Sequence, residues 1–183
     1  VASEARLFLI GWNFRVASVA VRDRVAFNPD EVREALKRIM GQGLAAESVI
    51  VSTCHRSEIY GLVEGELADL PVQRFLAEWR GLAPAEMAQS GFLREGSEAA
   101  RHLFRVAAGL DSMVLGESEV LGQVREALHL ARESGSSRTV LHRLFEGAVA
   151  AGKRVRTETQ IGMYPLSVTS IGLELAAKVF GDL

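Results

Sequence analysis

The most reactive group in this sequence is the thiol of Cys54, the only cysteine in the chain. It lies in the run Val49-Ile50-Val51-Ser52-Thr53-Cys54-His55-Arg56, in which β-branched residues give way to polar ones. This pattern predicts a buried strand that ends in a polar turn, where a rigid sheet can hold a reactive group toward a substrate. Nearby cations favour the thiolate, the nucleophilic form of cysteine. Cys54 is therefore a candidate nucleophile, and the alternative is a small buried hydrophobic residue.

A second candidate is His102, which lies on a predicted helix with Ala99 and Val106 on the same face. Two interpretations are open for it: a packing histidine in an apolar layer, or an imidazole that projects into a site. His129 and His142 lie in the middle of predicted helices, and a zinc site would need several convergent ligands that this sequence does not supply. The sequence therefore predicts no zinc site.

The segment 109–123 joins two predicted helices and mixes polar groups with bulky apolar ones. Its polar candidates are Ser112, Glu117, Ser118, Glu119 and Gln123. Glu119 and Gln123 are one helical turn apart and are expected to share a face. The segment is either the wall of a pocket or an ordinary capped connection between helices.

Composition bounds the class of protein. The chain has 183 residues, a hydrophobic fraction of 48%, a charged fraction of 24% and a net charge of -2. These values are typical of a soluble globular protein and do not favour a generally basic nucleic-acid binder. No apolar run approaches the roughly 18 residues of a membrane span, and no signal peptide opens the chain. A single cysteine forms no internal disulfide, so we expect a cytoplasmic protein with no membrane partner.

Strands are predicted at 6–11, 19–22, 47–53, 58–64 and 92–93, and helices at 28–40, 67–80, 97–108, 119–133, 139–157 and 167–180. Asn28 followed by Pro29 is a strong helix start, and Gly41 is the expected stop. Alternating strands and helices in the first part predict an α+β fold, a ferredoxin-like α/β sandwich with an antiparallel sheet, followed by additional helices.

One glycine pattern points to a nucleotide site but lacks the right context. Gly41-Gln42-Gly43-Leu44-Ala45-Ala46 matches the dinucleotide fingerprint G-x-G-x-x-A letter for letter. That motif works only between a strand and the N-terminus of a helix, where the pyrophosphate meets backbone N–H groups. Here a predicted helix precedes it and a strand follows. We interpret the segment as a helix end and linker.

Several motifs together resemble one family, the glutamyl-tRNA reductases. The family signature S-T-C-N-R-x-E-x-Y is similar to Ser52-Thr53-Cys54-His55-Arg56-Ser57-Glu58-Ile59-Tyr60. The family pattern H-L-x-R-V-A-x-G-L-D-S is similar to His102-Leu103-Phe104-Arg105-Val106-Ala107-Ala108-Gly109-Leu110-Asp111-Ser112. The segments 114–124, 151–159 and 167–170 also fit, so the resemblance covers nearly the whole chain.

The resemblance implies the first step of tetrapyrrole synthesis, in which NADPH reduces glutamyl-tRNA to glutamate-1-semialdehyde. It implies that Cys54 attacks the aminoacyl ester and holds the glutamyl group as a thioester, a better hydride acceptor than the ester. It implies an acid–base or orienting role for His102 and pairing of Arg56 with the substrate carboxylate. The implied substrate-binding positions are Thr53, His55, Arg56, Ser112, Glu117, Ser118, Glu119 and Gln123.

The sequence departs from the family pattern at three places. His55 replaces the usual asparagine, Ser118-Glu119 replaces Pro-Gln, and Asn13-Phe14-Arg15 stands where the family often has Asn-His-Lys. From the resemblance we expect a catalytic, glutamyl-tRNA-binding domain at 1–160 and, at 161–183, a linker and first helix leading into an NADPH-binding domain that this chain lacks. The implied partners are a second copy of the full-length protein and glutamate-1-semialdehyde aminomutase. A thiol hydrolase or acyltransferase, and a catalytically silent tRNA-binding or regulatory fragment, are the alternatives.

Overall fold

The fold is built on one antiparallel sheet. The computed structural model describes residues 5–65, 67, 70–117, 119–162 and 176–179. The four strands are β1 (Arg6–Asn13), β2 (Glu47–Thr53), β3 (Arg56–Val63) and β4 (Phe92–Glu95), in the order β2-β3-β1-β4. Every neighbouring pair is antiparallel. This is the β-α-β-β-α-β order of ferredoxin-like folds, so the predicted α+β class with additional helices is confirmed.

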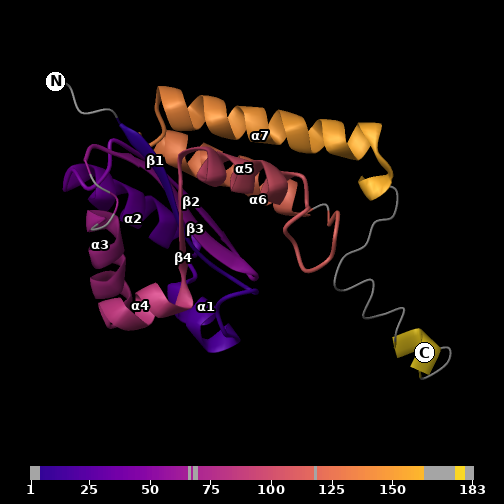
Figure 1. The fold of residues 1–183 in the computed structure, drawn as a ribbon, viewed down its shortest axis with the longest axis horizontal. Coiled ribbons are helices and arrows are strands. Elements are labelled where there is room, and N and C mark those ends of the chain that lie inside the picture. The colour runs from indigo at the N-terminus through magenta and orange to yellow at the C-terminus, as the bar shows by residue number, and fades with distance from the viewer. Residues whose placement is uncertain (1–4, 66, 68–69, 118, 163–175, 180–183) are drawn as a thin grey trace.

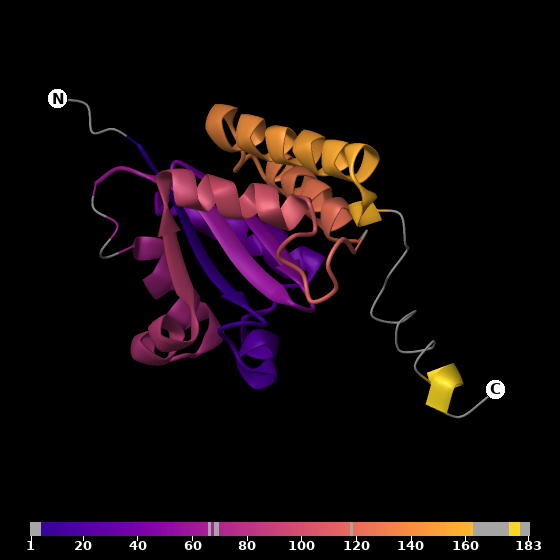
Figure 2. The same cartoon turned by 45° about the vertical axis from the view of Figure 1, so that its right-hand side comes forward.

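Helices cover both faces of the sheet (Figures 1 and 2). The helices of the ferredoxin-like part are α1 (Val19–Val25), α2 (Pro29–Gly41), α3 (Pro71–Arg80) and α4 (Pro84–Ser90). The later helices are α5 (Gly96–Ala107), α6 (Glu119–Glu133) and α7 (Thr139–Glu158), followed by the short 3-10 helix η2 (Gln160–Gly162). The later three lie together as one layer against the sheet, on the side opposite α4.

Strand alternation decides which side chains meet this later layer. Residues directly opposite each other on antiparallel strands share a face, and every second residue of a strand does too. Tyr60 of β3 packs edge-on against Phe145 of α7, with ring centroids 5.2 Å apart. Arg56 and Glu58 therefore also point from β3 toward the layer formed by α5, α6 and α7. Two ionisable groups are thus placed between the sheet and the helices.

The predicted bounds of a helix are confirmed where the sequence contains capping residues. Helix α2 begins at Pro29 because the Asn28 side chain accepts hydrogen bonds from the N–H groups of Asp30 and Glu31. Gln42 caps its end and Gly43 has a φ of 65°, so the fingerprint-like glycines are a helix end, as predicted. They supply no N-terminal phosphate cradle.

Three local predictions were wrong. The extended piece predicted at 19–22 is helix α1, because Ser18 caps it by accepting from the N–H of Val21. Helix α3 begins only at Pro71, which favours the first helical turn. Helix α4, which follows α3, was not predicted: the Gly- and Pro-bearing segment after residue 80 was expected to be a loop. Residues 176–179 are helical, whereas most of the helix predicted at 167–180, and of the predicted linker segment at 161–183, lies outside the described residues.

None of the helices in the described ranges combines the length and apolar character that a membrane crossing requires.

Candidate functional site

Cys54 lies at the tip of the β2–β3 hairpin. Thr53 and Arg56 are paired across the two strands, so Cys54 and His55 alone form the turn. The His55 N–H donates to Thr53 Oγ1 at 3.1 Å, and the Phe14 N–H donates to the His55 carbonyl at 3.1 Å. The turn is thereby fixed from both sides. The thiol of Cys54 is exposed, which excludes the alternative of a small buried hydrophobic residue.

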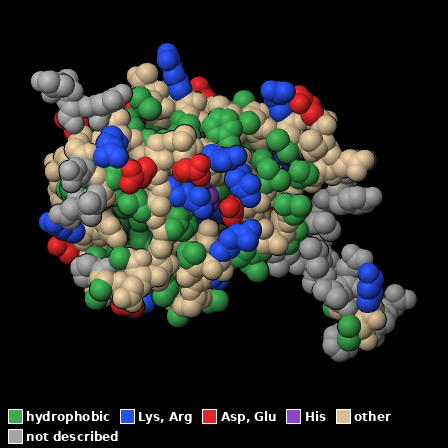
Figure 3. Space-filling view, in the orientation of Figure 1, with side chains coloured by type: hydrophobic (Ala, Val, Ile, Leu, Met, Phe, Trp, Pro, Cys, Tyr) green, Lys and Arg blue, Asp and Glu red, His purple; other side chains and the backbone are tan. Residues whose placement is uncertain are grey.

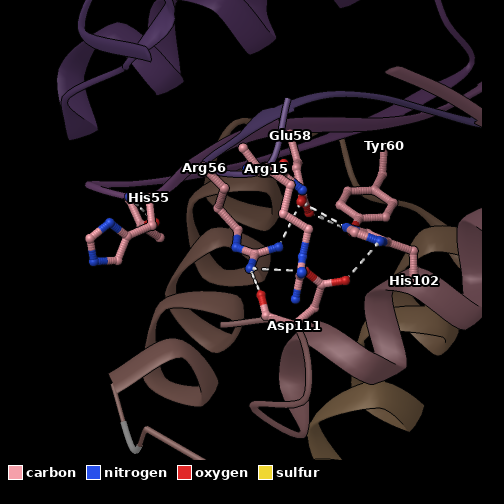
Figure 4. Close-up of polar contacts among 9 residues, drawn as sticks. Arg15, His55, Arg56, Glu58, Tyr60, His102 and Asp111 are labelled. Atoms are coloured by element: carbon pink, nitrogen blue, oxygen red, sulfur yellow. Dashed lines mark hydrogen bonds and ion pairs between the residues drawn. The ribbon is translucent and has the colours of Figure 1, made fainter. Parts of the chain in front are cut away.

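A buried ionic network lies directly behind this tip (Figure 4). The Arg56 side chain is 2% exposed, and its Nη1 donates to Glu58 Oε1 at 2.8 Å. Its Nη2 donates to the carbonyl of Asp111, which lies on the connection between α5 and α6. Glu58 also accepts from the Tyr60 hydroxyl at 2.8 Å. The strand that carries the turn is therefore joined through Arg56 to the helical layer.

His102 enters the same network from α5. Its Nε2 lies 2.8 Å from Glu58 Oε1, and its Nδ1 lies 3.9 Å from Asp111 Oδ2. Its ring also packs against Phe92, with centroids 5.4 Å apart. The imidazole is buried, and the polar contacts described for it go to Glu58 and Asp111 rather than to Cys54. The sequence left two interpretations open for His102, a packing histidine and an imidazole that projects into a site. The structure shows a buried ring whose two nitrogens face carboxylates.

Charge within the network follows from burial and pairing. Burial alone would raise the pKa of Glu58, but the Arg56 charge and the hydrogen bonds from His102 and Tyr60 lower that pKa to about 2. Burial and the Glu58 charge raise the pKa of Tyr60 well above its usual value. Glu58 is therefore an anion at neutral pH. Since a carboxylate only accepts, His102 Nε2 carries the proton in this hydrogen bond.

The connection between α5 and α6 forms the outer wall of the network. Asp111 accepts from Arg15 Nε at 3.3 Å, and the Arg15 N–H is bound by the Asn13 side chain at 3.0 Å. Ser112 is 8% exposed, and its Oγ has no hydrogen-bond partner among the described residues. A buried hydroxyl without a partner is unusual in folded proteins.

The remaining predicted positions are more dispersed. The Glu117 carbonyl accepts from Arg156, and Glu119 is exposed at the start of α6. Gln123 lines a cavity of about 120 Å³ together with Ser52 and Phe27, at the outer edge of β2. His55 points away from the ionic network (Figure 4). Ser118 lies outside the described residues.

Sequence reasoning missed four members of the network: Arg15, Glu58, Tyr60 and Asp111. Glu58 and Tyr60 did leave a signal. In a strand that is buried throughout, positions 56, 58 and 60 are polar and fall on one face. Asp111 and Arg15 left no such signal, because their partners are distant in sequence.

Charges on the surface are mixed. The face shown in Figure 3 has basic and acidic side chains side by side near its centre. Along α5, Arg101 lies 3.7 Å from Glu98, and Arg94 of β4 lies 3.9 Å from the same carboxylate. Among the residues that the structure describes, no three His, Cys, Asp or Glu side chains gather as metal ligands.

Comparison with known proteins identifies the family. The sequence profile of "Glutamyl-tRNAGlu reductase, N-terminal domain" matches residues 10–159, a range that includes the hairpin tip and the network. The chain belongs to this family. Its expected resemblance to glutamyl-tRNA reductases is thereby confirmed.

Individual relatives agree. The chain is 45% identical to the glutamyl-tRNA reductase of Geobacillus thermodenitrificans over 97% of its own length and 39% of that protein. It is 45% identical to the glutamyl-tRNA reductase of Thermus thermophilus over 97% of its length and 42% of that protein. The solved structure of the Methanopyrus kandleri glutamyl-tRNA reductase superposes with a TM-score of 0.71 at 34% identity, over 94% of this chain and 39% of that one. The chain thus spans about two fifths of these relatives.

Proposed function

We propose that this chain takes the glutamyl group of glutamyl-tRNA onto the Cys54 sulfur, as the acyl-transfer part of a glutamyl-tRNA reductase. The observation that carries the proposal is the exposed thiol at a fixed hairpin tip, two residues before an arginine that anchors the turn to a buried network. A nucleophile must be both accessible and held in place. Membership of the family supplies the acyl donor.

The proposed step is an exchange of esters. The Cys54 thiolate attacks the carbonyl carbon of the glutamyl ester, and a carbon–sulfur bond forms. The bond between that carbon and the ribose oxygen of the tRNA then breaks, and the oxygen takes up the proton that the thiol gave up. The products are deacylated tRNA and a glutamyl thioester, which divides one difficult reaction into two easier ones.

The buried network is proposed to orient this step. Both ring nitrogens of His102 face carboxylates, so we infer that it acts by fixing Glu58 and Arg56. Arg56 remains the proposed partner of the substrate carboxylate. Since its guanidinium is 2% exposed, that contact requires Asp111 to give way. Ser112 Oγ, which is buried and has no hydrogen-bond partner among the described residues, is the proposed second donor to the substrate.

Reduction of the thioester would need NADPH, and the described residues do not fit this cofactor. Its pyrophosphate is usually held at a glycine-rich turn between a strand and a helix N-terminus. Gly41 is instead the last residue of α2, and Gly43 lies between α2 and β2. We therefore propose that NADPH binds outside the described residues, and we assign to those residues acyl transfer alone. A cytoplasmic location, a homodimer of the full-length protein and a contact with glutamate-1-semialdehyde aminomutase are further proposals.

The test is direct detection of the acyl group. The chain is incubated with glutamyl-tRNA, quenched in mild acid and analysed by mass spectrometry, and we expect a glutamyl adduct on the peptide that contains Cys54. Cys54→Ser is the matched control and should carry none. Intact glutamyl-tRNA without an adduct would refute the proposal in favour of a silent tRNA-binding fragment. Equal reaction with a free glutamyl ester would favour a thiol hydrolase instead.

A further inference from the structure

The loop that carries Asp111 and Ser112 is closed at its base. We call residues 108–117, between α5 and α6, the site loop. The Gly116 N–H donates to the Gly109 carbonyl at 2.9 Å, and the two glycines have φ values of 80° and 73°. A Cβ added to Gly109 would lie 3.0 Å from the Cα of Gly116. Two glycines are required because their backbones touch in a conformation that other residues adopt at a cost.

Helix α7 reaches this base through one arginine. Arg156 Nη1 donates to the Gly116 carbonyl at 3.3 Å, and its Nη2 donates to the Glu117 carbonyl at 2.5 Å. Gly152, one helical turn earlier on the same face, lets α7 approach α5: a Cβ there would lie 2.5 Å from the Ala107 carbonyl. Close packing by Gly152 therefore brings Arg156 within reach of the loop.

The position of this cation is informative. The carbonyls of Gly116 and Glu117 come just before α6, which begins at Glu119. A helix N-terminus carries partial positive charge and disfavours a nearby cation. Arg156 is thus not placed for the stability of α6. Its two donated hydrogen bonds close the site loop.

The site loop is also hydrogen-bonded to the buried network. On its inner side, the Asp111 carbonyl accepts from Arg56 and the Asp111 carboxylate accepts from Arg15. On its outer side, Met113 and Leu115 are 54% and 60% exposed, so apolar packing does little to hold the loop there. We propose that Arg156 is a positioning residue for acyl transfer, which sets where Asp111 and Ser112 lie relative to Arg56. This proposal rests on the proposed function.

The main test compares Arg156→Ala with Arg154→Ala. Arg154 is the matched control, because it lies two residues away, is exposed and pairs with Glu158 of its own helix at 2.9 Å. We expect Arg156→Ala to slow single-turnover acylation of Cys54 at saturating glutamyl-tRNA by about 10- to 100-fold, the range that misplacement by about 1 Å produces. Arg154→Ala should stay within about twofold of the wild type, as surface changes usually do. Millimolar methylguanidinium should restore much of the rate to Arg156→Ala, and Arg156→Lys should be intermediate.

Two further readouts separate positioning from general damage. Alkylation of Cys54 by iodoacetamide should be unchanged in Arg156→Ala, because the hairpin turn makes no described contact with Arg156. Amide hydrogen exchange at Gly116 should be faster in Arg156→Ala and unchanged in Arg154→Ala. Wild-type acylation in Arg156→Ala, or a loss shared equally by Arg154→Ala, would overturn the proposal. If the wild type does not acylate, the proposed function fails, and unchanged Gly116 exchange would independently overturn the role of Arg156.

Discussion

Replacing Glu58 by glutamine keeps its shape but removes the anion that is hydrogen-bonded to both Arg56 and His102. The Asp111 carboxylate lies farther away, 4.0 Å from Arg56 and 3.9 Å from His102. In the unfolded chain this carboxyl has an ordinary pKa of 4.5, and in the folded protein its pKa is about 2. At about 1.36 kcal/mol per pKa unit, its ionisation contributes about 3 kcal/mol of stability at neutral pH. Breaking a buried ion pair from one side typically costs about 3–5 kcal/mol. We therefore expect Glu58→Gln to lower the free energy of unfolding at pH 7 by about 3–5 kcal/mol.

The same reasoning predicts how the free energy of unfolding depends on pH. Between pH 4.5 and about 2 the unfolded chain binds the Glu58 proton and the folded protein does not, so acid favours unfolding. The contribution of Glu58 is complete above pH 4.5 and is lost as the pH falls toward about 2. Urea unfolding at a series of pH values should show this loss in the wild type and not in Glu58→Gln.

Glu34→Gln is the control, since Glu34 is 54% exposed and the ion pair described for it is with Arg38 on its own helix. That change should alter stability by less than about 0.5 kcal/mol at any pH. If the free energy of unfolding fell with pH in the same way for the wild type and Glu58→Gln across the acid range, the assignment of Glu58 as the buried anion would be refuted.

Two further changes test how the helical layer is attached. The Glu47 carboxylate accepts from the N–H groups of Arg138, Val140 and Leu141 at the start of α7, at 3.0, 3.0 and 2.8 Å. Glu47→Gln should therefore lower stability by about 1–2 kcal/mol in urea unfolding, and no loss would show that this contact is not a cap. Gly152→Ala should lower the melting temperature because its Cβ would meet the Ala107 carbonyl. Gly122→Ala should raise the melting temperature, since no atom of the described residues lies within 4 Å of a Cβ there. Equal effects of the two glycine changes would contradict close packing of α7 on α5.

The sequence predicts those elements whose ends are marked by local chemistry. The strand 47–53 and the helix 119–133 have the predicted bounds, since β-branched runs and helical periodicity define them. The strand predicted from residue 58 begins at Arg56, because a two-residue turn lets pairing resume at once. Helix α1 was missed, since its seven residues show too little periodicity to outweigh the β-branched valines.

The site also has a part that the sequence predicts and a part that it does not. Cys54, His55 and Arg56 are contiguous, so their grouping could be predicted from the sequence alone. The link between Arg56 and His102 could not, because it passes through Glu58, whose significance appears only when β3 packs against α5. Register and the packing of helices on a sheet are tertiary properties, and no single-segment pattern encodes them.

Arg56 belongs to two parts of the molecule at once. Its backbone pairs with Thr53 and thereby closes the turn that presents Cys54. Its side chain leaves the strand and bonds both Glu58 and the Asp111 carbonyl of the site loop. Losing Glu58 would leave a buried cation uncompensated, and losing the Asp111 carbonyl would leave an N–H group of Arg56 unpaired. The two contacts therefore favour one arrangement of the turn and the site loop. The distance between the proposed nucleophile and Ser112 is therefore set by Arg56 on one side and, through the base of the loop, by Arg156 on the other.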